Sequence, residues 1–330
     1  MLKTTWLIAT LTPLMSLSVL AETPLPKYDA ECIQKALEDQ APNTTLQQLR
    51  DQCVLDQAAL EQGKTALNAR LLSEKSTKYD PFTIQPYRPN YLIIGSYNFA
   101  GTNEHPFQQA TLPQATHFEP YEAKFQISLK IPIADDLFGI GDHLYIGYTN
   151  RSFWQAYSHN ISAPFRETNH EPEVWMSFDN KMEIFGWRNR LIDVGLSHQS
   201  NGRSDPLSRS WNRIYTRLMF TKDNSTFSIK PWIRVPEAAS NDDNPNISHY
   251  MGNIEFTFTS KLEKHHFKIM VRDNFSETDN KGAFELGYSY PVHRNMKAYI
   301  QWFSGYGESL IDYNYRNNSI GIGVQFSGWS

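Results

Sequence analysis

Long hydrophobic runs, cysteines and an excess of charge of one sign are all scarce in this sequence of 330 residues. Beyond residue 21 no apolar run approaches the roughly 18 residues that a membrane-spanning helix needs. The 31 basic and 35 acidic residues nearly balance, giving a net charge of -4, which excludes the basic footprint typical of nucleic-acid-binding proteins. Any passage of this chain through a membrane must therefore use a β-barrel, whose strands are visible only as alternation.

The N-terminus carries the one hydrophobic run. Lys3 precedes it, and small residues end it at Val19-Leu20-Ala21. This pattern predicts a secretory signal peptide over residues 1–21, cleaved after Ala21. A membrane-anchoring helix is the alternative, but no cluster of stop-transfer charges follows.

From about residue 90 short segments alternate between apolar and polar residues and are separated by polar or Gly/Pro/Asn/Asp clusters. In one of them Phe125 and Ile127 share a face, while Lys124 and Gln126 share the opposite face. Twelve strands are predicted, at residues 91–99, 121–131, 143–153, 172–179, 189–200, 209–221, 225–235, 250–260, 264–273, 282–290, 296–304 and 318–328.

A soluble β-sandwich also alternates, so the pattern alone leaves two fold classes open. The even strand count favours a membrane barrel, as do short turns such as 222–225 between longer loops such as 154–171 and 236–249. The polar faces also carry charged residues, which suits a polar interior behind a lipid-facing band. We therefore predict an all-β fold over residues 79–330, a twelve-stranded antiparallel transmembrane β-barrel.

Residues 22–78 differ in composition from the predicted barrel. They are rich in Ala, Leu, Gln, Glu and Lys, which favour helix. We expect a short helical or partly disordered periplasmic extension. Both cysteines, Cys32 and Cys53, lie in it, and export would permit a disulfide between them.

Polar residues interrupt the apolar face of two neighbouring predicted strands. His198 and Ser200 share parity with Leu196, and Asn212 shares parity with Ile214, so all three polar residues face lipid near the extracellular rim. A serine, a histidine and an amide can serve as nucleophile, general base and the group that orients the base. The alternative is a set of interfacial polar residues without chemistry. The other histidines, His170 among them, are expected in or near loops and turns.

The stretch HQSNGRSDPLSRSWNR, residues 198–213, resembles the active-site signature of the outer membrane phospholipase A family. Further stretches fall in the family's order and extend the resemblance over residues 79–330. They are YDPFTIQPYRPNYLI (79–93), PFRETNHEP (164–172), KPWIRV (230–235), DDNPNI (242–247) and SGYGESLIDYN (304–314). The resemblance implies an enzyme of the bacterial outer membrane that hydrolyses acyl esters of phospholipids and lysophospholipids, depends on calcium and acts as a homodimer.

The same resemblance implies roles for individual residues. His198 matches the general base, Ser200 the nucleophile and Asn212 the residue that orients the histidine. The backbone amide of Gly202 matches the oxyanion donor. A neutral asparagine also avoids placing a carboxylate beside lipid, where a charge is costly.

Calcium ligands follow from the resemblance as well. The carbonyl of Arg203 and the hydroxyl of Ser208 match ligands from one subunit, and Ser162 matches the ligand from the partner subunit. Oxygen ligands suit calcium, and a cation beside a developing oxyanion stabilises it.

Two further expectations concern a second calcium site and the dimer. Asp205 matches a ligand of a weaker calcium position, to which either Asp242 or Asp243 would contribute. Asn150 stands where the family has a longer glutamine that hydrogen-bonds across the dimer.

A second class of function competes with the enzyme. A passive pore or adhesion barrel would have no chemistry at the polar cluster. The interior charges Lys124, Lys130, Arg213 and Arg217 are expected to fill much of the lumen, and twelve strands leave little room for a wide channel.

Overall fold

The computed structural model describes residues 67, 81–110, 117–158 and 163–326. The predicted signal peptide, the Cys32 and Cys53 pair and Ser162 lie outside the described residues. So does the predicted extension at 22–78, apart from Leu67, which is buried against Leu191 and Met219.

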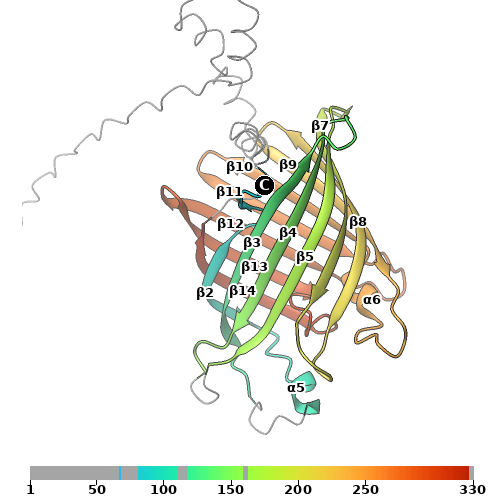
Figure 1. Cartoon of the computed structure of the whole chain (residues 1–330). Helices are drawn as coiled ribbons and strands as arrows, with labels where there is room; N and C mark the ends of the chain where they lie inside the picture. The colour runs from blue at the N-terminus through green and yellow to red at the C-terminus, as the bar shows by residue number, and fades with distance from the viewer. Residues whose placement is uncertain (1–66, 68–80, 111–116, 159–162, 327–330) are drawn as a thin grey trace, which may run out of the picture. The chain divides into compact units, whose positions relative to one another are not determined.

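Twelve antiparallel strands close into a barrel, in which each strand pairs with the next along the chain and the last pairs with the first (Figure 1). The predicted fold class and strand number are thus confirmed. The barrel strands are β2 (Tyr91–Asn98), β3 (Tyr121–Asp135), β4 (Asp142–Trp154), β5 (Phe165–Asp179), β7 (Trp187–Ser200), β8 (Ser210–Lys222), β9 (Ser225–Val235), β10 (Ile254–Leu262), β11 (His265–Asp273), β12 (Gly282–His293), β13 (Met296–Tyr306) and β14 (Arg316–Gln325). Two-residue strands, β1 (Gln85–Pro86) and β6 (Glu183–Ile184), add to β3 and β7.

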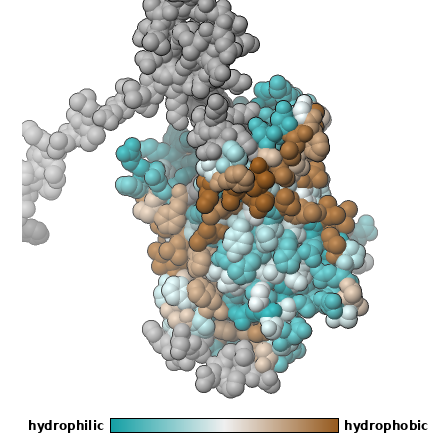
Figure 2. All heavy atoms as spheres, viewed as in Figure 1, coloured by the Kyte–Doolittle hydropathy of each residue, from teal (hydrophilic) through white to brown (hydrophobic). Residues whose placement is uncertain are grey.

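The alternation of the sequence separates the lumen from the outer surface. In β3, Lys124 and Lys130 are buried inside the barrel, whereas Ile127 and Leu129 are 50% and 36% exposed on its outside. Figure 2 shows a hydrophobic band across the face in view, with hydrophilic residues above and below it. This is the distribution that a barrel surrounded by lipid requires.

The two ends of the barrel differ in the length of their connections. One end, the turn end, has tight connections such as residues 223–224 and 263–264. The opposite end, the loop end, carries the described residues 99–110, 117–120, 155–158, 163–164, 201–209, 236–253, 274–281 and 307–315, with the short helices α5 (His105–Gln109) and α6 (Ile247–Met251). Among the described residues no helix is long and apolar enough to cross a membrane.

Strand β5 is longer than predicted. It begins at Phe165 rather than at residue 172, so the predicted loop 154–171 is wrong and the connection covers only residues 155–164. The residues from 166 to 171 are polar on both faces of the strand, which removes the alternation that marks a strand. His170, expected in or near a loop, therefore lies within β5.

Strand β10 also starts later than predicted, at Ile254 rather than at residue 250. The residues before it form α6, whose Ile247 and Met251 are buried. Apolar residues that fill a small core under a loop cannot be told from strand residues when only a few are present.

Ion pairs and aromatic rings line and cross the lumen. Arg88 enters it ahead of β2, with its Nη1 2.6 Å from Glu171 and its Nη2 2.5 Å from Glu173. Its neighbour Tyr87 stacks on Trp175 with ring centroids 4.7 Å apart. Buried charges are tolerable only when paired and hydrogen-bonded, and the lumen satisfies this by pairing opposite signs.

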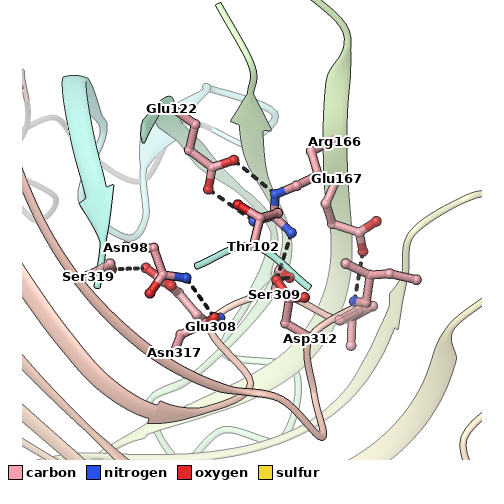
Figure 3. A network of polar contacts seen from close by, with 12 residues as sticks. Asn98, Thr102, Glu122, Arg166, Glu167, Glu308, Ser309, Asp312, Asn317 and Ser319 are labelled. Carbon is pink, nitrogen blue, oxygen red and sulfur yellow. Dashed lines mark hydrogen bonds and ion pairs between the residues drawn. The ribbon is translucent and has the colours of Figure 1, made fainter. Parts of the chain in front are cut away.

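Residues 307–315 fold into the loop end of the barrel rather than away from it. Leu310 and Ile311 are 1% and 0% exposed. The Ile311 amide donates to Glu167 at 3.1 Å, and Asp312 pairs with Arg166 at 2.7 Å (Figure 3). This inward loop forms the floor beneath the segment that follows β7.

Candidate active site

His198 and Asn212 face each other across the hairpin of β7 and β8. They are direct cross-strand partners, and His198 Nδ1 lies 2.8 Å from Asn212 Oδ1. On the same face Leu196 is 53% exposed and Ile214 is 48% exposed, so this face is the outer surface of the barrel. The histidine and the amide thus meet on the lipid-facing side, close to the loop end.

Ser200 is the last residue of β7, on the same side as His198 and half-buried. Within the described part of the chain no hydrogen bond joins its Oγ to His198. Alternate residues of a strand are about 7 Å apart, so side-chain rotation must close this gap. The structure brings the histidine and the amide together and leaves the serine adjacent to them.

The other end of the Asn212 amide is also engaged. Its Nδ2 donates to Oε1 of Glu237 at 3.0 Å. Glu237 lies just beyond β9, whose last residue, Val235, is the cross-strand partner of Asn212. Sequence reasoning missed this residue, because a glutamate after a strand-ending proline forms no motif.

A second cluster of polar side chains lies on β4 and β5, next to Ser200. His170 is the partner of Ser200 in the β5–β7 ladder. Its Nδ1 lies 2.6 Å from the Tyr148 hydroxyl and 3.4 Å from Nδ2 of Asn150. Asn150 Oδ1 accepts a hydrogen bond from Ser152 at 3.0 Å. Asn150, expected at a dimer contact, thus has partners within its own chain.

Residues 201–209 form a compact loop organised by the buried Asn201. Its Oδ1 accepts from the amides of Arg203 at 3.3 Å and Arg209 at 3.0 Å, and its Nδ2 donates to the Leu207 carbonyl at 2.8 Å. Leu207 packs in turn on Ile311 of the inward loop. The loop is therefore held both by its own hydrogen bonds and by the floor beneath it.

Tyr313, also in the inward loop 307–315, packs against the loop 201–209. The guanidinium of Arg209 lies over its ring, 5.9 Å from the centroid. Burial raises the pKa of the Tyr313 hydroxyl above its ordinary value. The phenol is therefore neutral at physiological pH and packs as part of the floor.

Gly202 occupies the left-handed region, with φ of +64°. Side chains other than glycine rarely adopt this conformation. A Cβ here would meet only the His170 ring, at 3.9 Å, so the constraint is the backbone and not space. Its amide donates no hydrogen bond to any described residue, which leaves the N–H available to a ligand.

Oxygen atoms gather where the loop meets residues 236–253. Ser208 Oγ donates to Asp243 Oδ2 at 2.5 Å, whereas Asp242 accepts from Arg234 at 2.6 Å. Asp205 is exposed and has no hydrogen bond in the described part of the chain. No group of three or more His, Cys, Asp or Glu able to hold a metal ion occurs among the described residues.

Fold and site together define a class, a transmembrane β-barrel with a serine, a histidine and an asparagine on its lipid-facing surface. The chain belongs to the phospholipase A1 family, whose model matches residues 67–326. The match begins within residues 22–78, ahead of the resemblance at 79–330.

Known relatives agree with this assignment. Phospholipase A1 of Salmonella typhimurium is 37% identical over 263 residues, covering 79% of this chain and 88% of that protein. The solved structure of outer membrane phospholipase A from Escherichia coli has a TM-score of 0.70 and 39% identity, covering 74% of this chain and 99% of that one. The Salmonella typhi outer membrane phospholipase, solved as a dimer with bound calcium, has a TM-score of 0.70 and 38% identity, covering 76% and 94%. The predicted family and the predicted outer-membrane location are confirmed.

Proposed function

We propose that this phospholipase hydrolyses the acyl ester bonds of membrane phospholipids and lysophospholipids, with Ser200 as its nucleophile. The observation that supports the proposal most strongly is the His198–Asn212 pair on the lipid-facing surface, with Ser200 beside it. A phospholipid ester in the bilayer can meet Ser200 there without entering the lumen. The substrate therefore explains the face on which the polar residues lie.

The first half of the reaction forms an acyl-enzyme. Asn212 Oδ1 accepts the Nδ1 proton of His198, which leaves the Nε2 lone pair free to act as a base. As Ser200 Oγ attacks the acyl carbonyl carbon, its proton passes to Nε2, and the Gly202 amide donates to the developing oxyanion. The tetrahedral intermediate then expels the lysophospholipid alkoxide, which takes the proton from His198.

The second half releases the fatty acid. Water attacks the acyl-Ser200 ester while His198 Nε2 accepts a proton from it. Collapse of the second tetrahedral intermediate returns this proton to Ser200 Oγ. The fatty acid leaves from the lipid-facing surface, so substrate and products can both stay within the bilayer.

Calcium fits the oxygen atoms around the loop. The Arg203 carbonyl accepts no hydrogen bond from the described residues, and Ser208 Oγ lies beside the Asp243 carboxylate. Such hard oxygen ligands suit calcium, and a calcium ion held by them would supply positive potential that stabilises the developing oxyanion. The relative solved with bound calcium supports this assignment. We propose Arg203 and Ser208 as ligands, completed by Ser162 of the partner subunit.

A second, weaker calcium site is proposed at Asp205. Asp242 and Asp243 are the two candidates for its partner carboxylate. Asp242 is paired with Arg234, while Asp243 is bonded to a proposed calcium ligand, and these contacts favour Asp243.

We propose a homodimer as the active form. The solved dimer of the Salmonella typhi relative supports it. The dimer would bring Ser162 of the partner subunit to the calcium ion and would join two lipid-facing surfaces into a groove for the acyl chain. Asn150 would contribute to the dimer by forming hydrogen bonds to the partner subunit in addition to those within its own chain.

The test measures fatty-acid release from phospholipid in mixed micelles by the full chain, with calcium and with EDTA. We expect EDTA to abolish release and Ser200→Ala to reduce it at least ~10³-fold. Ser210→Ala, a change of the cross-strand partner of Ser200, is the matched control and should retain activity. Undiminished release by Ser200→Ala would exclude the serine mechanism, and no release at any calcium concentration would favour the passive barrel.

A further inference from the structure

Glu237 reaches the site from the end of a third strand. Val235 closes β9 opposite Asn212, and Pro236, which has no N–H to donate, ends the ladder. Glu237, two residues beyond Val235, is half-buried and accepts a hydrogen bond from Asn212 Nδ2 at 3.0 Å. His198, Asn212 and Glu237 thus form one continuous chain of hydrogen bonds.

The amide of Asn212 fixes which group donates and which accepts in each of these two hydrogen bonds. An asparagine amide has one accepting and one donating end, and a half-turn exchanges them. If the NH2 group faced His198, the ring proton would sit on Nε2, and that nitrogen could not accept the Ser200 proton. An ionised carboxylate can only accept, so Glu237 can pair only with the NH2 group. The amide oxygen is then left facing His198 Nδ1.

We propose that Glu237 is a positioning residue, which holds Asn212 in the orientation that selects the reactive tautomer of His198. The inference rests on the proposed function of Ser200 and His198. The negative charge of Glu237 also favours the imidazolium that forms while His198 holds a proton. Because Glu237 lies past the end of β9, at the loop end, its charge avoids the cost of the membrane interior.

A purely structural role would make Glu237 an anchor of residues 236–253. That segment has other anchors. Asp242 pairs with Arg234 at 2.6 Å, Asn244 Oδ1 accepts from the Ser210 amide at 2.9 Å, and Ile247 is fully buried. Glu237 has no other hydrogen-bond partner in the described part of the chain. Its partner among the described residues is the amide proposed to orient the base.

The test measures kcat and KM for fatty-acid release by the full chain in phospholipid mixed micelles with saturating calcium. Glu237→Ala should lower kcat about five- to tenfold with KM unchanged, the effect of one lost hydrogen bond. Glu237→Gln should lie between Glu237→Ala and the unaltered enzyme, because its amide can accept from Asn212 but can also turn and lacks the charge. Glu277→Ala, which removes an exposed acid at the same end of the barrel, controls for charge and should match the unaltered enzyme.

Combining Glu237→Ala with Asn212→Ala distinguishes positioning from anchoring. If Glu237 acts through Asn212, the second change should cost nothing further once Asn212 is gone. The proposal would be overturned if Glu237→Ala lowered kcat equally in the unaltered enzyme and in Asn212→Ala. It would also be overturned if Glu237→Ala changed KM alone or left kcat unchanged. Ser200→Ala is assayed in parallel. If it is inactive while Glu237→Ala is normal, only the Glu237 assignment fails, and if it is fully active, the proposed function fails and the assignment with it.

Discussion

At the scale of single residues, Asn212 is the centre of the site because both ends of its amide are used. Its oxygen faces His198 at 2.8 Å and its nitrogen faces Glu237 at 3.0 Å. Aspartate keeps the shape of the side chain but cannot donate while ionised. It would therefore set two carboxylates against each other at the Glu237 contact, and like charges at this distance repel.

We accordingly predict that Asn212→Asp lowers fatty-acid release about tenfold at neutral pH. Adding Glu237→Gln should recover part of the loss, because the glutamine amide can donate to the new carboxylate. Release rates of the two variants and of the unaltered chain give the comparison. Full activity of Asn212→Asp alone would show that the Glu237 contact does not matter in the working enzyme.

The sequence predicts some residues of this site and not others. The faces of His198, Ser200 and Asn212 follow from parity, since alternate residues of a strand share a face. Glu237 follows a strand-ending proline, where parity stops being a guide. His170 lies in a stretch that is polar on both faces, so no alternation shows where it points.

At the scale of elements, the loop from residue 201 to 209 carries the proposed oxyanion donor and calcium ligands. Ser208 connects it to residues 236–253 through its bond to Asp243. Asp242, adjacent in sequence, instead pairs with Arg234. Two neighbouring aspartates therefore serve different partners, and calcium titration can separate them.

Asp243→Asn should raise the calcium concentration for half-maximal release about tenfold, because it removes the carboxylate beside Ser208. Asp242→Asn is the matched change. It should have a smaller effect on that concentration, because it removes the ion pair with Arg234 and not the carboxylate beside Ser208. Fatty-acid release is measured across a calcium series for both variants. A larger effect of Asp242→Asn than of Asp243→Asn on that calcium concentration would instead make Asp242 the carboxylate that takes part in calcium binding.

Strand prediction succeeded where one face is apolar and failed where it is not. The bounds of β9 were predicted to the residue, because its outer face is apolar up to Val235. The first seven residues of β5 were missed, because Arg166, Glu167 and Asn169 face the lumen while Thr168 and His170 face outward. A strand that carries polar groups on both faces gives no periodic signal, and these polar groups flank the proposed site.

At the scale of the whole molecule, charge pairs cross the lumen of the barrel. Arg213 pairs with Glu171 at 2.7 Å and Arg217 with Asp193 at 2.5 Å. The inward loop 307–315 covers the loop end, with Glu308 2.5 Å from Lys124. The predicted inward orientation of Lys124, Arg213 and Arg217 is thus what the structure shows.

We predict that the full chain in planar lipid bilayers gives no stable channel conductance, because these ion pairs occupy the lumen that ions would cross. Current is recorded at increasing voltage, with a water-filled porin as the positive control. Steady, ohmic openings of the unaltered chain would support the passive barrel instead.

The number and direction of the strands could be predicted from the sequence more directly than the closing of the barrel between its first and last strands. Alternation and loop lengths indicated twelve antiparallel strands, but the pairing of β14 with β2 joins residues at the two ends of the barrel sequence. Such long-range pairing leaves no local mark, and only the features that favour a membrane barrel over a sandwich indicate it.

The central claim is that the nucleophile is Ser200, on the lipid-facing surface. It is tested most directly by labelling with a long-chain alkyl fluorophosphonate in the bilayer, which phosphonylates an activated serine with loss of fluoride, followed by mass spectrometry of the peptides. The account predicts an adduct on Ser200 that disappears in His198→Ala. An adduct on Ser197, which is buried in the lumen beside Glu171, or labelling that does not depend on His198, would contradict it.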